Sequence, residues 1–239
     1  MQYRIHPALA GAFVFGLACF SCSARIDGTV REGGQADLAV RTALEPRMSA
    51  LIRSFQAALG SGPAELILDG PAIGRSMAAA PGIGSVSLKN SGPAALEGDI
   101  KVAHAGDFLS AGEKKFITFT EISGGVPSGS IVIALDRETA PEVIALLSAD
   151  AVDYLSALMA PAATGEILSR QEYLELVASL YGKAVADEIS SARIRAYLDF
   201  PGPVVSVRSG TASGRRAEFE VPLLDLLVLD RPLRYEVNW

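Results

Sequence analysis

The residues of this chain with the most specific chemistry are two cysteines, Cys19 and Cys22. They lie at the end of an almost wholly apolar run, Ala8 to Phe20, which follows the lone cation Arg4. This order is typical of a bacterial export signal that is cleaved at a cysteine, whose thiol then carries a diacylglycerol through a thioether. The run is too short to span a bilayer as a helix, which takes about 20 residues. We therefore predict a lipoprotein signal peptide over residues 1–21 and attachment to a membrane through acyl chains such as palmitate.

The two cysteines differ as acceptors of the lipid. Cys19 follows the suitable small residue Ala18, but Gly16 stands where such signals usually have leucine. Cys22 follows a small residue, Ser21, and polar chain resumes only after it. Cleavage at Cys19 would leave Phe20 at the membrane surface. We predict lipidation of Cys22, with Cys19 as the alternative and an ordinary secretory signal as the remaining possibility.

Outside the signal, the residues suited to nucleophilic or metal chemistry are few. His104 is the only histidine there, so a catalytic triad or a Cys/His zinc site would depend on it alone. The sequence has no Gly-x-Ser-x-Gly, Gly-x-Gly-x-x-Gly or P-loop pattern. His104 is in phase with the apolar residues of a predicted strand, which indicates a hydrogen-bonded histidine at the margin of the core. We predict no catalytic residues, no metal and no cofactor, and hence no enzyme.

Two pairs of carboxylates stand three residues apart, Asp150 with Asp153 and Glu172 with Glu175. Such pairs can carry acid–base chemistry, and a carboxylate-based hydrolase would need two of them to converge in a cleft. Both pairs open predicted helices, where acids complement the positive end of the helix. We interpret them as helix-start residues.

Basic residues gather in the C-terminal part of the chain, and glycines in the region before residue 98. The basic residues could meet lipid headgroups, but we expect them to pair across strands with Glu218 and Glu220. The glycines could cradle an anion, but no strand–helix frame accompanies them, so we interpret them as loop glycines. The arginines are Arg193, Arg195, Arg208, Arg215 and Arg216, and the glycines are Gly60, Gly62, Gly74, Gly82, Gly84 and Gly92.

The first elements are predicted from alternation and helical spacing. Strands over 24–31 and 35–42 form a bulged hairpin, in which a three-residue loop, Gly33 to Gln35, pairs Val30 with Leu38. A helix over 47–59 follows and places Leu51, Ile52 and Phe55 on the inner face of the sheet.

The rest of the chain continues as strands, helices and strands. Residues 60–98 are rich in turns, with a short helix near 71–80 and a strand at 85–89. Thr139 with Glu142 and Ser169 with Glu172 match capping boxes at helix starts. Further strands are predicted over 96–104, 116–122, 131–135, 193–200, 204–207, 215–221 and 233–239, with a helical block over 138–192. We predict one α+β domain over 22–239, built on a mostly antiparallel sheet that joins N- and C-terminal strands, with a helical insertion at about 138–192.

Several segments resemble a group of uncharacterised treponemal (spirochaete) membrane lipoproteins. The resemblance is carried by residues 22–28 (CSARIDG), 43–53 (ALEPRMSALIR) and 153–161 (DYLSALMAP), with Gly165-Glu166 and 172–174 (EYL) after them. It covers most of the mature chain. The resemblance implies an envelope location and acylation, and it implies no particular activity.

Composition narrows the function classes. Arg4 leaves with the signal, so 20 of the 21 cations remain against 27 acids, and the mature net charge is −7. That sign argues against nucleic acid and against general electrostatic adhesion to anionic lipid. We predict an envelope lipoprotein, held on the periplasmic or outer surface of a membrane, with a non-enzymatic binding or structural role. Its partner beyond the membrane would be a protein or an apolar ligand. The alternative is a carrier of a lipid or other apolar ligand, which an enclosed apolar cavity would favour.

Overall fold

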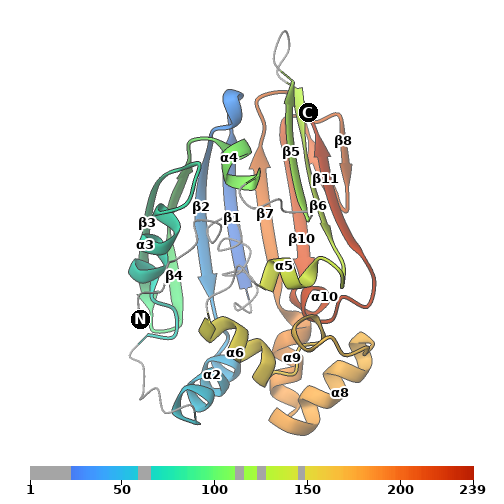
Figure 1. The fold of residues 1–239 in the computed structure, drawn as a ribbon. Coiled ribbons are helices and arrows are strands. Elements are labelled where there is room, and N and C mark those ends of the chain that lie inside the picture. The colour runs from blue at the N-terminus through green and yellow to red at the C-terminus, as the bar shows by residue number, and fades with distance from the viewer. Residues whose placement is uncertain (1–22, 59–65, 111–115, 123–127, 145–148) are drawn as a thin grey trace.

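The computed structural model describes residues 23–58, 66–110, 116–122, 128–144 and 149–239, and it contains two β-sheets flanked by helices (Figure 1). The seven-stranded sheet A has the order β3 (Ile83–Gly92), β4 (Ala95–Val102), β2 (Ala36–Ala43), β1 (Ser23–Val30), β7 (Arg193–Asp199), β10 (Arg216–Pro222) and β9 (Gly210–Ser213). The four-stranded sheet B has the order β5 (Ile117–Ile122), β6 (Ser128–Leu135), β11 (Leu233–Asn238) and β8 (Ser206–Arg208). The predicted α+β class is confirmed, with mostly antiparallel pairing.

Sheet A joins the two ends of the chain through one parallel pair of strands. β1 pairs antiparallel with β2 on one side and parallel with β7 on the other, and the remaining neighbours in the sheet are antiparallel. A parallel pair needs a long crossover, and the chain between β1 and β7, which includes β2, supplies it. The predicted pairing of N- and C-terminal strands is therefore confirmed.

The β1–β2 hairpin has a different register from the predicted one. Val30 pairs with Ala36, and Leu38 pairs with Gly28. The connection spans residues 31–35 and contains the short 3₁₀ turn η2 (Glu32–Gly34), in which Gly33 and Gly34 both have positive φ. The loop therefore begins two residues earlier than the predicted three-residue loop and ends at the same residue, so the partner of Val30 is Ala36 instead of Leu38. Within the loop, Arg31 N–H donates to the Gln35 carbonyl at 2.7 Å.

A single sheet would require the C-terminal strand to pair within sheet A, but it does not. β11 pairs with β6 and β8 in sheet B instead. The chain passes from β8 in sheet B to β9 in sheet A through Ser209, a non-glycine residue with φ of 58°. The last residue, Trp239, stacks on Phe200 with ring centroids 4.6 Å apart and contacts Phe119, so aromatic side chains fill this part of the space between the sheets.

The helices cover the sheets at several places. The described helices are α2 (Pro46–Ala58), α3 (Gly70–Ala78), α4 (Ala105–Ser110), α5 (Ala140–Ile144), α6 (Ala149–Ala157), α7 (Pro161–Thr164), α8 (Arg170–Tyr181), α9 (Lys183–Ser191) and α10 (Leu223–Val228). The predicted helical block corresponds to α5–α9. Helices α2, α6, α8 and α9 lie together beyond one end of sheet A (Figure 1). Among the described residues, no helix is both long and apolar enough to cross a membrane.

Helix α2 packs on other helices, which corrects the prediction that it covers the inner face of the sheet. Its contacts are with α6 and α9, and Phe55 meets Tyr181 of α8 edge-to-face at 5.7 Å. Ile52 is almost completely buried, with 2% exposure, whereas Leu51 and Phe55 are only partly buried. The apolar stripe was correctly identified, but the surface that covers it is helical.

Candidate functional site

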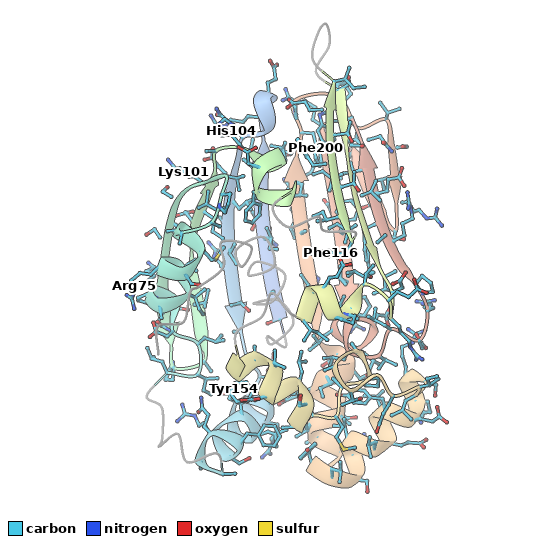
Figure 2. All side chains as sticks on the ribbon, in the orientation of Figure 1. Arg75, Lys101, His104, Phe116, Tyr154 and Phe200 are labelled. Carbon is cyan, nitrogen blue, oxygen red and sulfur yellow. The ribbon has the colours of Figure 1, made fainter. Side chains whose placement is uncertain are left out.

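The structure separates most of the sequence-predicted candidates. Cys19 and Cys22 lie outside the described residues, so lipidation stays a prediction. His104 is exposed, because β4 ends at Val102 and the chain turns into α4, which corrects its predicted place at the core margin. Figure 2 shows His104 at the same end of the molecule as α4. Within the described ranges, no three His, Cys, Asp or Glu side chains gather as a metal site would require.

The carboxylate pairs have local roles at their helices. Ser169 and Glu172 form the predicted capping box, in which Ser169 Oγ accepts from Glu172 N–H and Glu172 Oε2 accepts from Ser169 N–H. These hydrogen bonds lower the pKa of Glu172 below its usual value. Glu175 Oε1 accepts from Gln171 Nε2 at 2.7 Å. Asp153 lies within α6, and the side chain of Asp150 is outside the description. At the other predicted box, Thr139 Oγ1 hydrogen-bonds with Asp136.

The C-terminal arginines divide into several groups. Arg193 and Arg195 both approach Glu220, at 3.6 and 2.8 Å, as the cross-strand prediction requires. Arg216 lies 3.9 Å from Glu218. Arg215 Nε instead donates to the Phe200 carbonyl at 2.7 Å, and Arg208 is exposed at the end of β8.

The interpretation of the glycines as loop residues is wrong for most of those described. Gly74 lies in α3, and Gly84 and Gly92 lie in β3. Gly82 does occupy a turn, with φ of 77°, and a Cβ there would meet the His104 carbonyl oxygen at 2.4 Å. Gly82 therefore serves close backbone approach, whereas a Cβ at Gly74, Gly84 or Gly92 would make only ordinary contacts. Gly60 and Gly62 lie outside the described residues.

Three exposed arginines lie side by side on one face of sheet A. Arg41, Arg25 and Arg195 occupy matched positions on the neighbouring strands β2, β1 and β7, and we call these three residues the arginine row. Side chains at matched positions share a face, and neighbouring strands lie about 4.8 Å apart. All three side chains are exposed, so this is the outer face of the sheet. Like charges directly opposite one another destabilise a sheet, which makes three adjacent arginines an arrangement that needs compensation.

Acidic residues supply part of that compensation. Arg25 donates from Nε and Nη2 to both carboxylate oxygens of Asp27, each at 2.7 Å. These bonds lower the pKa of Asp27 and raise that of Arg25. Arg195 Nε donates to Glu220 at 2.8 Å. Arg41 lies 3.9 Å from Glu97, an ion-pair distance that is too long for a hydrogen bond.

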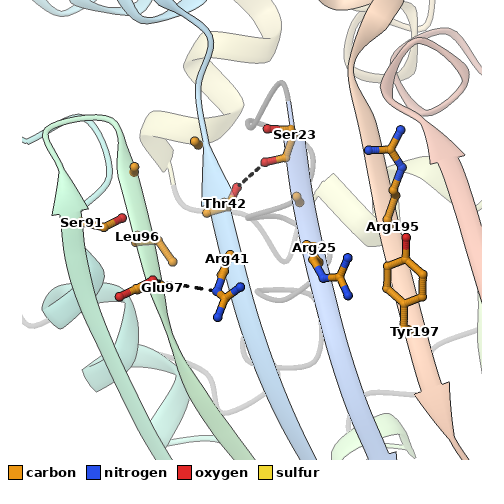
Figure 3. Close-up of a pocket in the computed structure, with 12 residues that line it drawn as sticks. Ser23, Arg25, Arg41, Thr42, Ser91, Leu96, Glu97, Arg195 and Tyr197 are labelled. Carbon is orange, nitrogen blue, oxygen red and sulfur yellow. Dashed lines mark hydrogen bonds and ion pairs between the residues drawn. The ribbon is translucent and has the colours of Figure 1, made fainter.

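The arginine row borders an open depression of about 430 Å³ (Figure 3). Small residues from three neighbouring strands, among them Ser23, Ala43 and Ala95, lie beside the long arginine side chains and leave the space between them. Tyr197 adds an aromatic ring, and the Arg25 guanidinium lies 4.2 Å from its centroid. The other lining residues are Ala24, Thr42, Ser91, Leu96 and Glu97. The lining holds three arginines and one glutamate, and Asp27 and Glu220, which pair with Arg25 and Arg195, lie directly beside it.

A second charged cluster surrounds a buried carboxylate and has a structural role. Asp225 of α10, with only 4% exposure, accepts from Arg170 of α8 at 2.8 Å and from Arg231 at 3.4 Å. Arg170 also reaches Asp230 at 3.3 Å. Burial raises the pKa of the neighbouring Tyr235, and the Asp225 carboxylate raises it further. The cluster connects α8 to α10 and the start of β11.

Sequence reasoning did not bring the members of the arginine row together. Alternation predicts that Arg25 and Arg41 point away from the core. Their meeting with Arg195 depends on the parallel pairing of β1 and β7, whose register no local pattern encodes. Helix α10 and the buried Asp225 were also missed, because LLDLLV carries only one polar residue in an apolar run.

No family model matches the chain, and no curated protein sequence matches it. Among solved structures, the chain is similar to the folded domain of the Mycobacterium tuberculosis LppM protein, determined by NMR. The TM-score is 0.40 with 8% identity, over 90% of this chain and 87% of that chain. A likeness of this strength identifies neither a family nor a function. The resemblance to treponemal lipoproteins therefore stays a prediction.

Proposed function

We propose that this chain is a lipoprotein of the bacterial cell envelope, anchored by acyl chains on Cys22, whose folded domain has a binding or structural role rather than a catalytic one. The proposal places the domain on the periplasmic or outer surface of a membrane. A diacylglycerol supplies two chains, and two chains are what firm anchoring takes.

One observation carries the proposal. Strand β1 begins at Ser23, the residue directly after Cys22, and it lies inside sheet A with partners on both sides. Ser23 itself pairs with Ala43 and Arg193 and lines the depression. An acyl chain on Cys22 would therefore join the membrane to the fold without a linker. A polar, arginine-bordered surface would be held next to the lipid.

The described depression does not suit an apolar ligand. The depression is open and bordered by charged side chains, whereas an apolar ligand needs an enclosed apolar cavity. Between the sheets, the described side chains of Phe200, Trp239 and Phe119 pack against one another. Native mass spectrometry after gentle detergent extraction tests the carrier reading directly, since a co-purifying lipid would support it.

The site of lipid attachment is tested by replacing the cysteine that accepts the lipid. Cys22→Ser should abolish incorporation of labelled fatty acid and release the protein from the detergent phase. Cys19→Ser is the matched control and should keep both properties. Labelling that persists in Cys22→Ser and disappears in Cys19→Ser would move the anchor to Cys19.

The absence of catalysis is tested by metal content and by His104. Elemental analysis of the purified protein should give no stoichiometric metal, and a chelator should leave the melting temperature unchanged. His104→Gln should leave any measured ligand binding intact, because its side chain is exposed and lies away from the depression. A tightly held metal with His104 among its ligands would contradict the proposal.

A further inference from the structure

The arginine row has free hydrogen-bonding capacity on an exposed face. Among the described residues, the Arg195 side chain hydrogen-bonds through Nε alone, and the Arg41 guanidinium makes no hydrogen bond. Guanidinium groups present several N–H donors in a plane and bind phosphate through two parallel hydrogen bonds. Exposed ion pairs such as Arg195 with Glu220 contribute little to stability, so an incoming phosphate can compete with the carboxylates at small cost.

The position of the row relative to the predicted anchor points to one source of phosphate. Arg25 is three residues from Cys22, and a strand rises about 3.3 Å per residue. The headgroup region of each leaflet is about 5–7 Å thick. A lipid on Cys22 would therefore bring Arg25, and with it Arg41 and Arg195 at the matched positions, within reach of headgroup phosphates.

The helices limit the ways in which the anchored domain can face the membrane. Helices α2, α6, α8 and α9 lie beyond the end of sheet A at which β1 starts, so they obstruct an end-on approach (Figure 1). The inner face at that end is covered, since Ala24 and Ile194 pack in one cluster with Ala140 and Val143 of α5. The outer face, with Ser23 and the row exposed on it, is the open route (Figure 3).

We propose that the arginine row binds phosphate groups of the phospholipid headgroups around the anchor and thereby holds the outer face of sheet A against the membrane. This inference rests on the proposed acylation of Cys22 and adds a second, orienting contact to it. The negative charge of the whole chain is compatible with such a contact, because charges farther away than about 10 Å are screened at 0.1 M salt. Asp27, Glu97 and Glu220 offset the charge of the row locally, so what the headgroups meet is the hydrogen-bonding capacity that Arg41 and Arg195 keep on this face.

The experiment measures which face of the acylated protein lies against the bilayer. The full-length protein is produced with its lipid and reconstituted into vesicles that contain phosphatidylglycerol and a nickel-chelating headgroup lipid. A spin label is placed at Ala39→Cys, an exposed position on the outer face, or at Glu138→Cys, an exposed position beside α5. Relaxation of the label by nickel reports its distance from the headgroups.

The row is tested by a triple variant with a charge-matched control. The triple variant carries Arg25→Gln, Arg41→Gln and Arg195→Gln. Near an anionic surface, each replacement should lower the ratio of molecules with the outer face toward the membrane to molecules in other orientations by up to roughly fivefold. Arg53→Gln, Arg75→Gln and Arg208→Gln remove the same charge from exposed sites elsewhere and should leave the orientation unchanged. The triple lysine variant of the row should keep part of the preference. Raising the salt to 1 M should weaken the preferred orientation of the wild-type protein without releasing the protein from the vesicles.

The outcomes separate the anchor from the orienting contact. Mass analysis of each variant first establishes whether the lipid is on Cys22. With the lipid present, stronger relaxation at Ala39 than at Glu138 that disappears in the row variant supports the inference. Equal relaxation at both labels, or a preference that the row variant keeps, overturns it while the anchor stands. A chain without lipid on Cys22 overturns both proposals.

Discussion

The helical end of the molecule and the outer face of sheet A differ in how far their side chains are buried. At the helical end, Tyr173, Val177 and Ile189 are completely buried, and the acid Asp225 is buried between two arginines. On the outer face, every charged group of the arginine row is exposed and its ion pairs reach solvent. Burial makes the first region the source of stability, because apolar contact area and buried hydrogen bonds dominate folding energetics. The second region contributes little to stability, so its side chains are free to meet a partner.

The largest effect expected from this contrast is in α2. Ile52→Ala should lower the free energy of unfolding by about 2–5 kcal/mol, because it empties a fully buried site. Phe55→Ala should cost less than a fully buried phenylalanine would, since Phe55 is partly exposed beside Tyr181. Arg53→Ala is the exposed control and should be nearly neutral. Chemical denaturation of the three variants checks the order, and a larger effect for Phe55 than for Ile52 would contradict it.

The next effect concerns the buried carboxylate. Asp225→Asn should lower the free energy of unfolding by about 1.5–3 kcal/mol, because hydrogen bonds to charged groups contribute that much. The control is Glu236→Gln, an acid that pairs with Arg234 on the surface of sheet B. Thermal unfolding monitored by circular dichroism should show a clear loss for Asp225→Asn and little for the control. Equal shifts would mean that the ion pairs of the buried Asp225 do not stabilise the fold.

A smaller effect is expected at the start of α8. Ser169→Ala removes the N-cap acceptor and should cost about 1 kcal/mol. Ser213→Ala, on the exposed edge strand β9, is the matched control and should have no measurable effect. Amide hydrogen exchange in the first turn of α8 gives the local readout, with faster exchange expected in Ser169→Ala. Unchanged exchange there would show that the box does not stabilise the helix start.

The smallest effect is expected on the outer face and depends on pH. Arg25 lowers the pKa of Asp27, so their pairing stabilises the fold only while Asp27 is ionised. The stability difference between wild type and Arg25→Gln should be fully present above about pH 4, the ordinary value for an aspartate. It should disappear as the pH falls through the lower, folded-state pKa of Asp27. A difference that persists in strong acid would mean that Arg25 stabilises through packing on Tyr197 instead.

Much of the local structure follows from the sequence because side-chain periodicity is a local property. In the strand predicted over 96–104, alternation with period two predicts that Leu96, Ile100 and Val102 face inward, and all three are buried in the structure. The Ser169–Glu172 box begins α8 where predicted, since a cap needs only four neighbouring residues. The helical block and the final strands are also present near their predicted bounds.

Only the tertiary structure decided which of these elements are neighbours. The same apolar stripe on α2 could face a sheet or helices, and the fold covers it with α6 and α9. The split into two sheets depends on β11 pairing with β6 rather than with β10. The arginine row exists because a parallel register sets Arg25 beside Arg195, which is 170 positions away along the chain. The periodicity of the sequence predicts on which face of its strand or helix a side chain lies. Which residues it contacts there depends on long-range strand pairing, and that pairing is selected by the burial of the whole core.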